Sequence, residues 1–117
     1  MDLTIEQVLK QGVVAHREGK LQDAERFYRT VLQSQPTNPD ANHNLGLILI
    51  SANKAEEALP LLRTALETNP KEEQFWLSYI NLLIKVNQLD IAKQVFQQAK
   101  KQGMDGENFY PLEAQLS

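Results

Sequence analysis

The chain has 117 residues, enough for one domain with a single hydrophobic core. Hydrophobic residues make up 42% and charged residues 23%, a composition typical of a folded globular protein rather than a disordered one. The formal net charge of −3 argues against nucleic-acid binding, which needs an excess of Lys and Arg, and no apolar run approaches the roughly 20 residues that span a bilayer. We therefore expect neither a nucleic acid nor a membrane as a partner.

The sequence contains no cysteine, which excludes disulfides, thiolate nucleophiles and cysteine-bound metal sites. This is compatible with a reducing compartment, and we expect a cytoplasmic protein. The two histidines, His16 and His43, are predicted near opposite ends of neighbouring helices, too far apart to share a metal. The sequence has no phosphate-binding glycine loop, zinc-protease motif or nucleophile elbow. We therefore expect no cofactor, no metal and no catalytic site.

Apolar residues recur at helical spacing along the whole chain and predict six successive helices. The expected ranges are 4–18, 21–34, 39–52, 55–68, 72–86 and 89–102. Gly19, Asn53 and Asn87 follow the first, third and fifth helices, where a residue in the left-handed conformation closes a helix end. Pro36 and Pro70 follow the second and fourth helices and prevent their continuation.

Several local signals predict how the helices begin. Thr4 and Gln7 have the spacing of a capping box, and Asn38 stands before a proline as an N-cap residue would. Pro60 lies inside the predicted fourth helix, where a proline costs about 3 kcal/mol. We expect its missing N–H to fall in or just after the first turn, which gives a locally distorted start rather than a broken helix.

The sequence matches itself at an offset of 34 residues. Glycine, alanine, a large apolar residue and proline each recur at one slot: Gly12 and Gly46; Ala24, Ala58 and Ala92; Tyr28, Leu62 and Phe96; Pro36 and Pro70. A repeat of this length is the signature of stacked helical hairpins. We therefore predict a single all-α domain over residues 1–117, an α-solenoid of three antiparallel helix pairs with repeats at about 5–38, 39–72 and 73–106.

Residues 107–117 follow the third repeat and include four large apolar side chains, Phe109, Tyr110, Leu112 and Leu116. They predict a short C-terminal helix that caps the exposed face of the third pair, since end repeats need a cap. The segment can equally be the first part of a fourth repeat. Four apolar side chains are more than a solubilising cap needs, which favours a fragment of a longer protein.

These residues resemble the tetratricopeptide repeat family, whose pattern runs W-x2-L-G-x2-Y, then A-x3-F, A and P. The middle repeat matches it at Leu45, Gly46, Ala58, Ala65 and Pro70. The third repeat supplies Trp76, but Ile80 and Met104 replace its glycine and proline. The resemblance implies a right-handed superhelix whose first helices line a concave groove, which family members generally use to bind a protein or peptide. It also implies that Trp76 is a packing residue.

If the first helix of each pair faces inward, the apolar and hydrogen-bonding side chains on that face are candidate peptide-binding residues. They are Leu9, Val13, His16, His43, Asn44, Leu47, Ile50, Leu77, Asn81 and Ile84. Six of them are apolar, and an exposed apolar surface usually marks a binding site. The alternative interpretation is that neighbouring helices shield half of them.

Two finer resemblances concern this groove. Asn44-Leu45-Gly46 is similar to the repeats of O-GlcNAc transferases, where asparagines line the concave face and bind peptide backbone. The equivalent slots here hold Lys10 and Ser78, so a lone groove asparagine is at least as good an interpretation. Members that bind chaperone tails hold a terminal carboxylate with Lys, Asn and Arg at five positions. The matching residues here are Leu9, Val13, Asn44, Gln74 and Ser78, and only Asn44 agrees.

The favoured hypothesis is a non-catalytic interaction scaffold that binds a peptide or partner helix in the concave groove, with Asn44 and Asn81 bonding to its backbone. A first alternative is the N-terminal targeting segment of a larger bacterial glycosyl-, sulfo- or methyltransferase. A second alternative is self-association into a homo-oligomer.

Overall fold

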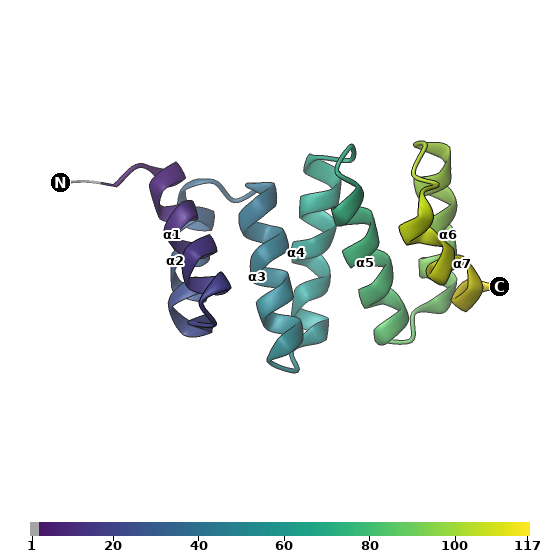
Figure 1. Ribbon diagram of the computed structural model, residues 1–117, viewed down its shortest axis with the longest axis horizontal. Helices are drawn as coiled ribbons and strands as arrows, with labels where there is room; N and C mark the ends of the chain where they lie inside the picture. Colours follow the sequence, from purple (N-terminus) through teal and green to yellow (C-terminus); the bar gives the residue numbers. More distant parts are fainter. Residues whose placement is uncertain (1–2) are drawn as a thin grey trace.

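A computed structural model describes residues 3–117, which form helices and no strand. The helices are α1 (Ile5–Arg17), α2 (Leu21–Ser34), α3 (Pro39–Ser51), α4 (Ala55–Thr68), α5 (Glu73–Lys85), α6 (Leu89–Lys101), the short 3-10 turn η1 (Glu107–Phe109) and α7 (Tyr110–Leu116). The first six helices pair as three antiparallel hairpins that stand in a row, and α7 lies in front of α6 at the C-terminal end (Figure 1). The fold is therefore the predicted all-α solenoid with a short C-terminal helix.

The predicted helix starts are confirmed by their caps. The Thr4 hydroxyl accepts a hydrogen bond from the Gln7 N–H at 3.1 Å, and the Gln7 side-chain oxygen accepts one from the Thr4 N–H at 2.8 Å. The Asn38 side chain accepts from the Ala41 N–H at 2.9 Å at the start of α3. Each cap pairs backbone donors that the first turn of a helix leaves free.

The predicted left-handed residues close α1, α3 and α5. Gly19, Asn53 and Asn87 have φ angles of 80°, 63° and 64°. A fourth such residue, Gly103 with φ 87°, ends α6 and was not expected. It lies one residue before Met104, the position at which the first two repeats have proline, so a left-handed glycine ends the helix where no proline does.

Pro60 lies just after the first turn of α4, one of the two places that the sequence predicts for it. Because α4 begins at Ala55, Pro60 is its sixth residue and lies beyond the first turn, where its nitrogen can no longer be one of the unpaired groups. The helix nevertheless continues without interruption to Thr68. Pro60 is exposed, so its ring and the Glu56 carbonyl that lacks an N–H partner face solvent rather than the core.

Small residues set the spacing of the first two hairpins. A Cβ atom built on Gly12 would lie 2.7 Å from Tyr28 Cε1, and one built on Gly46 would lie 2.7 Å from Leu62 Cδ2. No side chain fits at such a distance. In the third hairpin the same slot holds Ile80, which is fully buried, and α5 and α6 approach each other less closely than the other pairs do (Figure 1).

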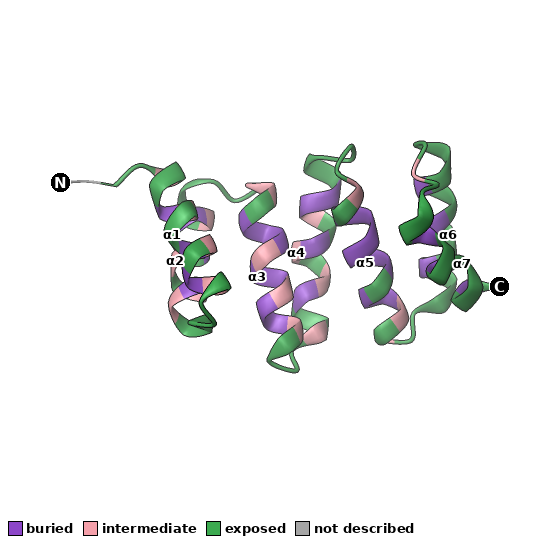
Figure 2. Ribbon diagram, in the orientation of Figure 1, coloured by how far each residue is buried: buried purple, intermediate pink, exposed green. Residues whose placement is uncertain are grey.

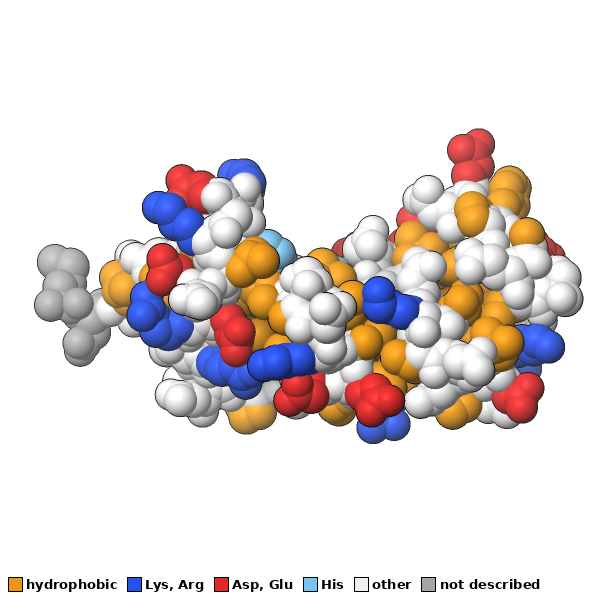
Figure 3. Space-filling model, turned by 90° about the horizontal axis from the view of Figure 1, so that it is seen from below, with side chains coloured by type: hydrophobic (Ala, Val, Ile, Leu, Met, Phe, Trp, Pro, Cys, Tyr) orange, Lys and Arg blue, Asp and Glu red, His pale blue; other side chains and the backbone are white. Residues whose placement is uncertain are grey.

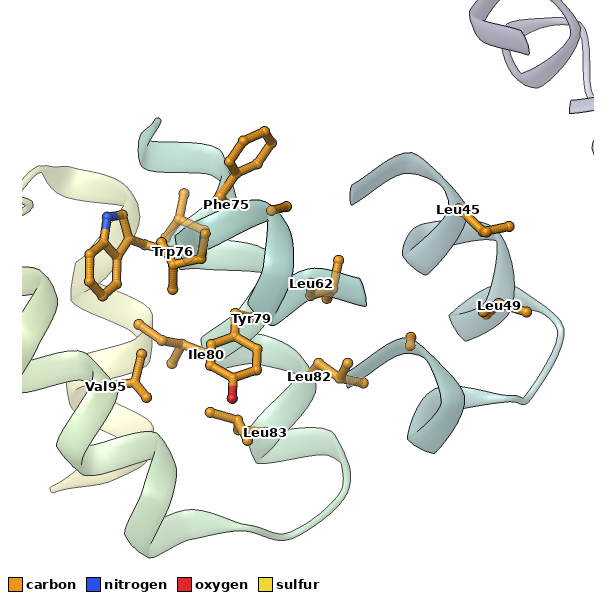
Figure 4. Close-up of a cluster of buried hydrophobic side chains, with 14 of the residues drawn as sticks. Leu45, Leu49, Leu62, Phe75, Trp76, Tyr79, Ile80, Leu82, Leu83 and Val95 are labelled. Atoms are coloured by element: carbon orange, nitrogen blue, oxygen red, sulfur yellow. The ribbon is translucent and has the colours of Figure 1, made fainter. Parts of the chain in front are cut away.

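Large side chains fill the wider third hairpin. In Figure 4, Ile80 lies among Trp76, Tyr79 and Leu83, with Val95 facing them from α6. The Trp76 indole N–H donates to the Pro70 carbonyl at 2.7 Å. One repeat earlier, the Asn42 side chain makes the same link to the Pro36 carbonyl at 3.0 Å. Trp76 is therefore a packing residue, as the family resemblance implied, and its polar atom ties its helix to the preceding loop.

The C-terminal helix packs as a first helix of a repeat does. Phe109 and Leu116 are buried against α6, and they stand 34 residues after Phe75 and Leu82, which are buried in the third repeat (Figure 2). Phe109 lies 6.4 Å from Phe96 between ring centroids. Tyr110, which occupies the Trp76 slot, is 61% exposed. The segment thus covers α6 as a cap would and keeps the register of the repeats.

No helix within residues 3–117 is long and apolar enough to cross a bilayer.

The hairpin contact gives a stability prediction. Ala58 is completely buried on α4, so Ala58→Leu overpacks the second hairpin and is expected to lower the free energy of unfolding by about 1–3 kcal/mol. Gln33 is exposed on α2, and Gln33→Ala is expected to change it by less than about 0.5 kcal/mol. Urea melts of both variants measure the difference. Equally small effects would show that the core is not packed as described.

Candidate functional site

The candidate site is the hollow of the solenoid, which Figure 3 shows as a depression between the two raised ends of the molecule. Residues of α1, α3 and α5 that are separated by 34 positions lie at equivalent places on this face. Seven of the ten predicted groove residues are half-buried: Leu9, Val13, His16, Asn44, Leu47, Ile50 and Ile84. Asn81 is exposed. Eight candidates are thus accessible to a ligand.

The remaining two candidates are covered by neighbouring helices. His43 is 6% exposed and Leu77 is 8% exposed, so both belong to the packed layer beneath the groove surface. The Phe75 ring of α5 lies over His43, with the two ring centroids 4.9 Å apart. His43 and Leu77 can therefore shape the groove floor but offer little surface to a partner.

A line of hydrogen-bonded side chains runs along this floor. The His43 Nε2 atom lies 2.7 Å from Ser78 Oγ, and His43 Nδ1 lies 3.3 Å from Asn44 Oδ1. The Gln74 side-chain amide donates to Ser78 Oγ at 3.3 Å. Because an amide oxygen only accepts, His43 carries its proton on Nδ1, and Ser78 donates its hydroxyl hydrogen to Nε2. The link joins α3 to α5 across the boundary between two repeats.

A second polar contact lies within the first repeat, where the Tyr28 hydroxyl oxygen is 3.3 Å from His16 Nδ1. Burial raises the pKa of Tyr28, and the Asn44 side chain opposes that rise. Tyr28 therefore stays protonated at neutral pH. None of the buried side-chain polar atoms in residues 3–117 lacks a hydrogen-bond partner.

His43 is held in its neutral form by its surroundings. Burial lowers its pKa, because a charged imidazole is poorly solvated there. The Asn44 hydrogen bond and the charges of Asp40 and Glu72 act in the opposite direction, and His16 adds to the lowering. The net shift is downward, so the neutral network described above is the form expected at neutral pH.

Ser78, His43 and Asn44 have the order of a nucleophile, a base and a residue that orients the base. Two observations argue against catalysis. Ser78 is itself only 8% exposed, so an incoming carbonyl cannot reach its oxygen. It is also the sixth residue of α5, where backbone N–H groups are paired within the helix and cannot form an oxyanion hole. Within the described residues, no three His, Cys, Asp or Glu side chains cluster as metal ligands would.

The chaperone-tail positions contain no cation. Leu9, Val13 and Asn44 are half-buried, Gln74 is exposed, and Ser78 is buried and bonded to His43. A terminal carboxylate placed over them would meet no positive charge to offset its desolvation. Without a cation at these five positions, we expect no carboxylate clamp of this kind from them.

The positions on the groove floor could be predicted from the sequence, but the hydrogen bonds between them could not. Ser78, a slot that does not match the family pattern, bridges two repeats through its hydrogen bond to His43, and Tyr28, a core aromatic, bonds His16 within the first repeat. The sequence does hold one signal for the bond between His43 and Ser78. The position equivalent to His43 in the third repeat is residue 77, and the hydroxyl-bearing Ser78 comes directly after it. A hydroxyl at that place can reach the imidazole only if the repeats pack closely, which the sequence alone does not specify.

The buried imidazole makes stability depend on pH. The unfolded chain binds a proton at His43 with an ordinary pKa of about 6.5, whereas the folded chain binds it only at lower pH. The stabilising contribution of His43 is therefore complete above that value and is lost as the pH falls toward the folded-state pKa. Urea unfolding at pH 7.5, 6.0 and 5.0 measures the free energy of unfolding. Between pH 7.5 and 5.0 this free energy should fall less in His43→Gln than in the parent chain. Parallel profiles would contradict the assignment.

Comparison with known proteins agrees with this architecture. A sequence model of the tetratricopeptide repeat family matches residues 15–76 and again residues 49–116. No curated protein sequence gives a significant match. Among solved structures, an O-GlcNAc transferase of Thermobaculum terrenum is 28% identical with a TM-score of 0.73, over 86% of this chain and 20% of that one. The chain thus spans a fifth of the length of that enzyme.

Two further structures share the fold at lower identity. The first tetratricopeptide domain of Spaghetti (RPAP3), bound to an HSP90 peptide, has a TM-score of 0.83 at 14% identity, over 96% of this chain and 89% of that one. A tetratricopeptide repeat protein of Parabacteroides merdae has a TM-score of 0.80 at 22% identity, over 89% and 41% of the two chains. With the repeats, the turns and the family match in agreement, the chain belongs to the tetratricopeptide repeat family.

Proposed function

We propose that the chain is a non-catalytic scaffold that holds a protein segment against its concave face. The tetratricopeptide fold is generally a scaffold for protein–protein interaction, which supports this class of function. The observation that carries the proposal is that the first helices of the three hairpins bear half-buried apolar side chains, which we call the apolar row and which are Leu9, Val13, Leu47, Ile50 and Ile84. Water remains in contact with these side chains in the free protein, so a partner that displaces it gains free energy.

The groove asparagines contribute differently to this proposal. Asn81 uses its amide N–H to bond the Leu77 carbonyl at 2.9 Å, and its own side-chain oxygen has no partner among residues 3–117. It is exposed, so it can accept from a ligand N–H. Asn44 is already bonded to His43, and a ligand would have to compete with that bond. Asn81 is thus the better candidate for contact with a partner backbone.

A charge in the middle of the apolar row tests the groove. Leu47→Glu is expected to weaken partner binding at least tenfold, because a carboxylate would have to be desolvated in the interface. The immobilised chain first isolates partners from cell extract, and titration calorimetry then compares the purified partner with each variant. Gln33→Glu, which adds the same charge on the exposed face of α2, is the matched control. Unchanged binding by a folded Leu47→Glu would remove the groove from the proposal.

A second candidate is a targeting segment at the N-terminal side of a larger bacterial transferase. It is supported by the 28% identity to the Thermobaculum terrenum O-GlcNAc transferase, of which this chain covers 20%. The downstream reading frame distinguishes the two candidates. A transferase domain in frame after Ser117 would support the second, and a stop codon there would exclude it.

A further inference from the structure

The two edges of the groove carry opposite charges. The first helices run parallel to one another, so their N-terminal ends line one edge and their C-terminal ends line the other (Figure 1). Glu6 and Asp40 stand on the first edge, and Arg17 and Lys85 on the second. We call these pairs the acidic rim and the basic rim. The apolar row of the proposed site lies between them.

These four charges are available to a partner. All four side chains are exposed. None of the salt bridges within residues 3–117 includes any of them, since the ion pairs formed there involve other residues. Helix ends carry about half a unit charge, which favours acids at N-termini and bases at C-termini. A full carboxylate or cation more than offsets that partial charge, so each rim keeps the sign of its side chains.

The acidic rim acts on the floor of the groove. The charges of Asp40 and Glu72 both raise the pKa of His43 against the effect of burial, and Asp40 also raises that of Tyr28. A field that reaches these buried rings also reaches a ligand lying over them, where the displaced water would have screened it.

The spacing of the rims fits one kind of occupant. Glu6 and Arg17 are 11 residues apart on α1, which is about 16 Å along a helix axis. An α-helix with its side chains is roughly 10–12 Å wide, and long charged side chains extend that reach. A helix lying across α1, α3 and α5 can therefore place an apolar stripe on the floor and reach both rims with its flanks.

We propose that the partner segment is an amphipathic α-helix with an apolar stripe, Lys or Arg along the flank that meets the acidic rim, and Asp or Glu along the flank that meets the basic rim. This inference rests on the groove being the binding site, and it adds the conformation and charge pattern of the ligand. The opposite rims also fix the direction of the helix, because reversing it would place like charges together.

Synthetic helices test the charge pattern directly. The first probe is a peptide of about 20 residues, roughly 30 Å long as a helix, with a Leu stripe, Lys on one flank and Glu on the other. The second has the same composition with Lys and Glu mixed on both flanks. The first is expected to bind at least threefold more tightly in fluorescence titrations, with an advantage that shrinks at high salt. Equal affinities, or no binding of either peptide, would overturn the proposal.

Charge reversal on the protein completes the test. Asp40→Lys and Lys85→Glu are each expected to weaken the first peptide about 3- to 10-fold. Reversal of all four rim charges, by Glu6→Lys, Asp40→Lys, Arg17→Glu and Lys85→Glu together, is expected to restore it, because the helix can then bind in the opposite direction. Glu67→Lys reverses an exposed charge on α4 and is the matched control, expected to leave binding unchanged. Asp40 is chosen for the single substitution on the acidic rim rather than Glu6. Lys10 stands one helical turn from Glu6 and competes with the peptide for its charge. A fourfold variant that binds the first peptide more weakly than either single variant would contradict the proposal.

Other occupants give different results. A version of the first peptide with a central proline should lose most of its affinity, and equal binding would indicate an extended ligand instead. A dimer of the free chain that Leu47→Glu dissociates would place a second copy in the groove and overturn the proposal. If Leu47→Glu abolishes peptide binding while the charge reversals have no effect, the groove stands and only the charge inference fails. If Leu47→Glu has no effect, the proposed function fails with it.

Discussion

The rest of the structure depends on the contact between the two helices of each hairpin. In the first two hairpins a glycine of the first helix lies against Tyr28 or Leu62 of the second, at a distance that leaves no room for a methyl group. The second helices present fully buried alanines at positions equivalent to Ala58. Backbones held this closely fix the angle at which the next hairpin stacks. That angle places the first helices on one face, and the groove follows from it.

The third hairpin shows that the close contact at glycine is not required if large side chains fill the space between the two helices. Ile80 in the glycine slot holds α5 and α6 apart, and the added space takes Trp76 and Tyr79 (Figure 4). At the end of the same repeat, Gly103 terminates α6 in the absence of the usual proline. The two departures from the family pattern therefore have local compensations, and the register continues into α7, where Phe109 repeats the burial of Phe75.

Much of the fold could be predicted from the sequence because its signals are local and repeated. The left-handed turns at Asn53 and Asn87, the Thr4 cap and the six helices each depend on residues close together in the chain. The burial of His43 could not be predicted this way, because it depends on how closely α5 approaches α3 and on the Phe75 ring that covers it. Pro60, by contrast, needed only local information: α4 begins at Ala55, the start expected for it, and Pro60 is its sixth residue, just after the first turn.

The floor of the groove sets its shape, and the rims set its charge preference. His43 and Ser78 are buried and bonded to each other between α3 and α5, so breaking that bond would leave a buried polar group unpaired, at a cost of about 1–3 kcal/mol. This contact favours one arrangement of the second and third hairpins and fixes the width of the groove between them. The exposed rim charges contribute little to that rigidity, since Asp40 and Lys85 form no salt bridge with any of residues 3–117. A partner therefore meets a groove whose width is set by buried groups and whose charge preference is set by exposed ones, and substitution of the rims can change the preferred ligand without altering the fold.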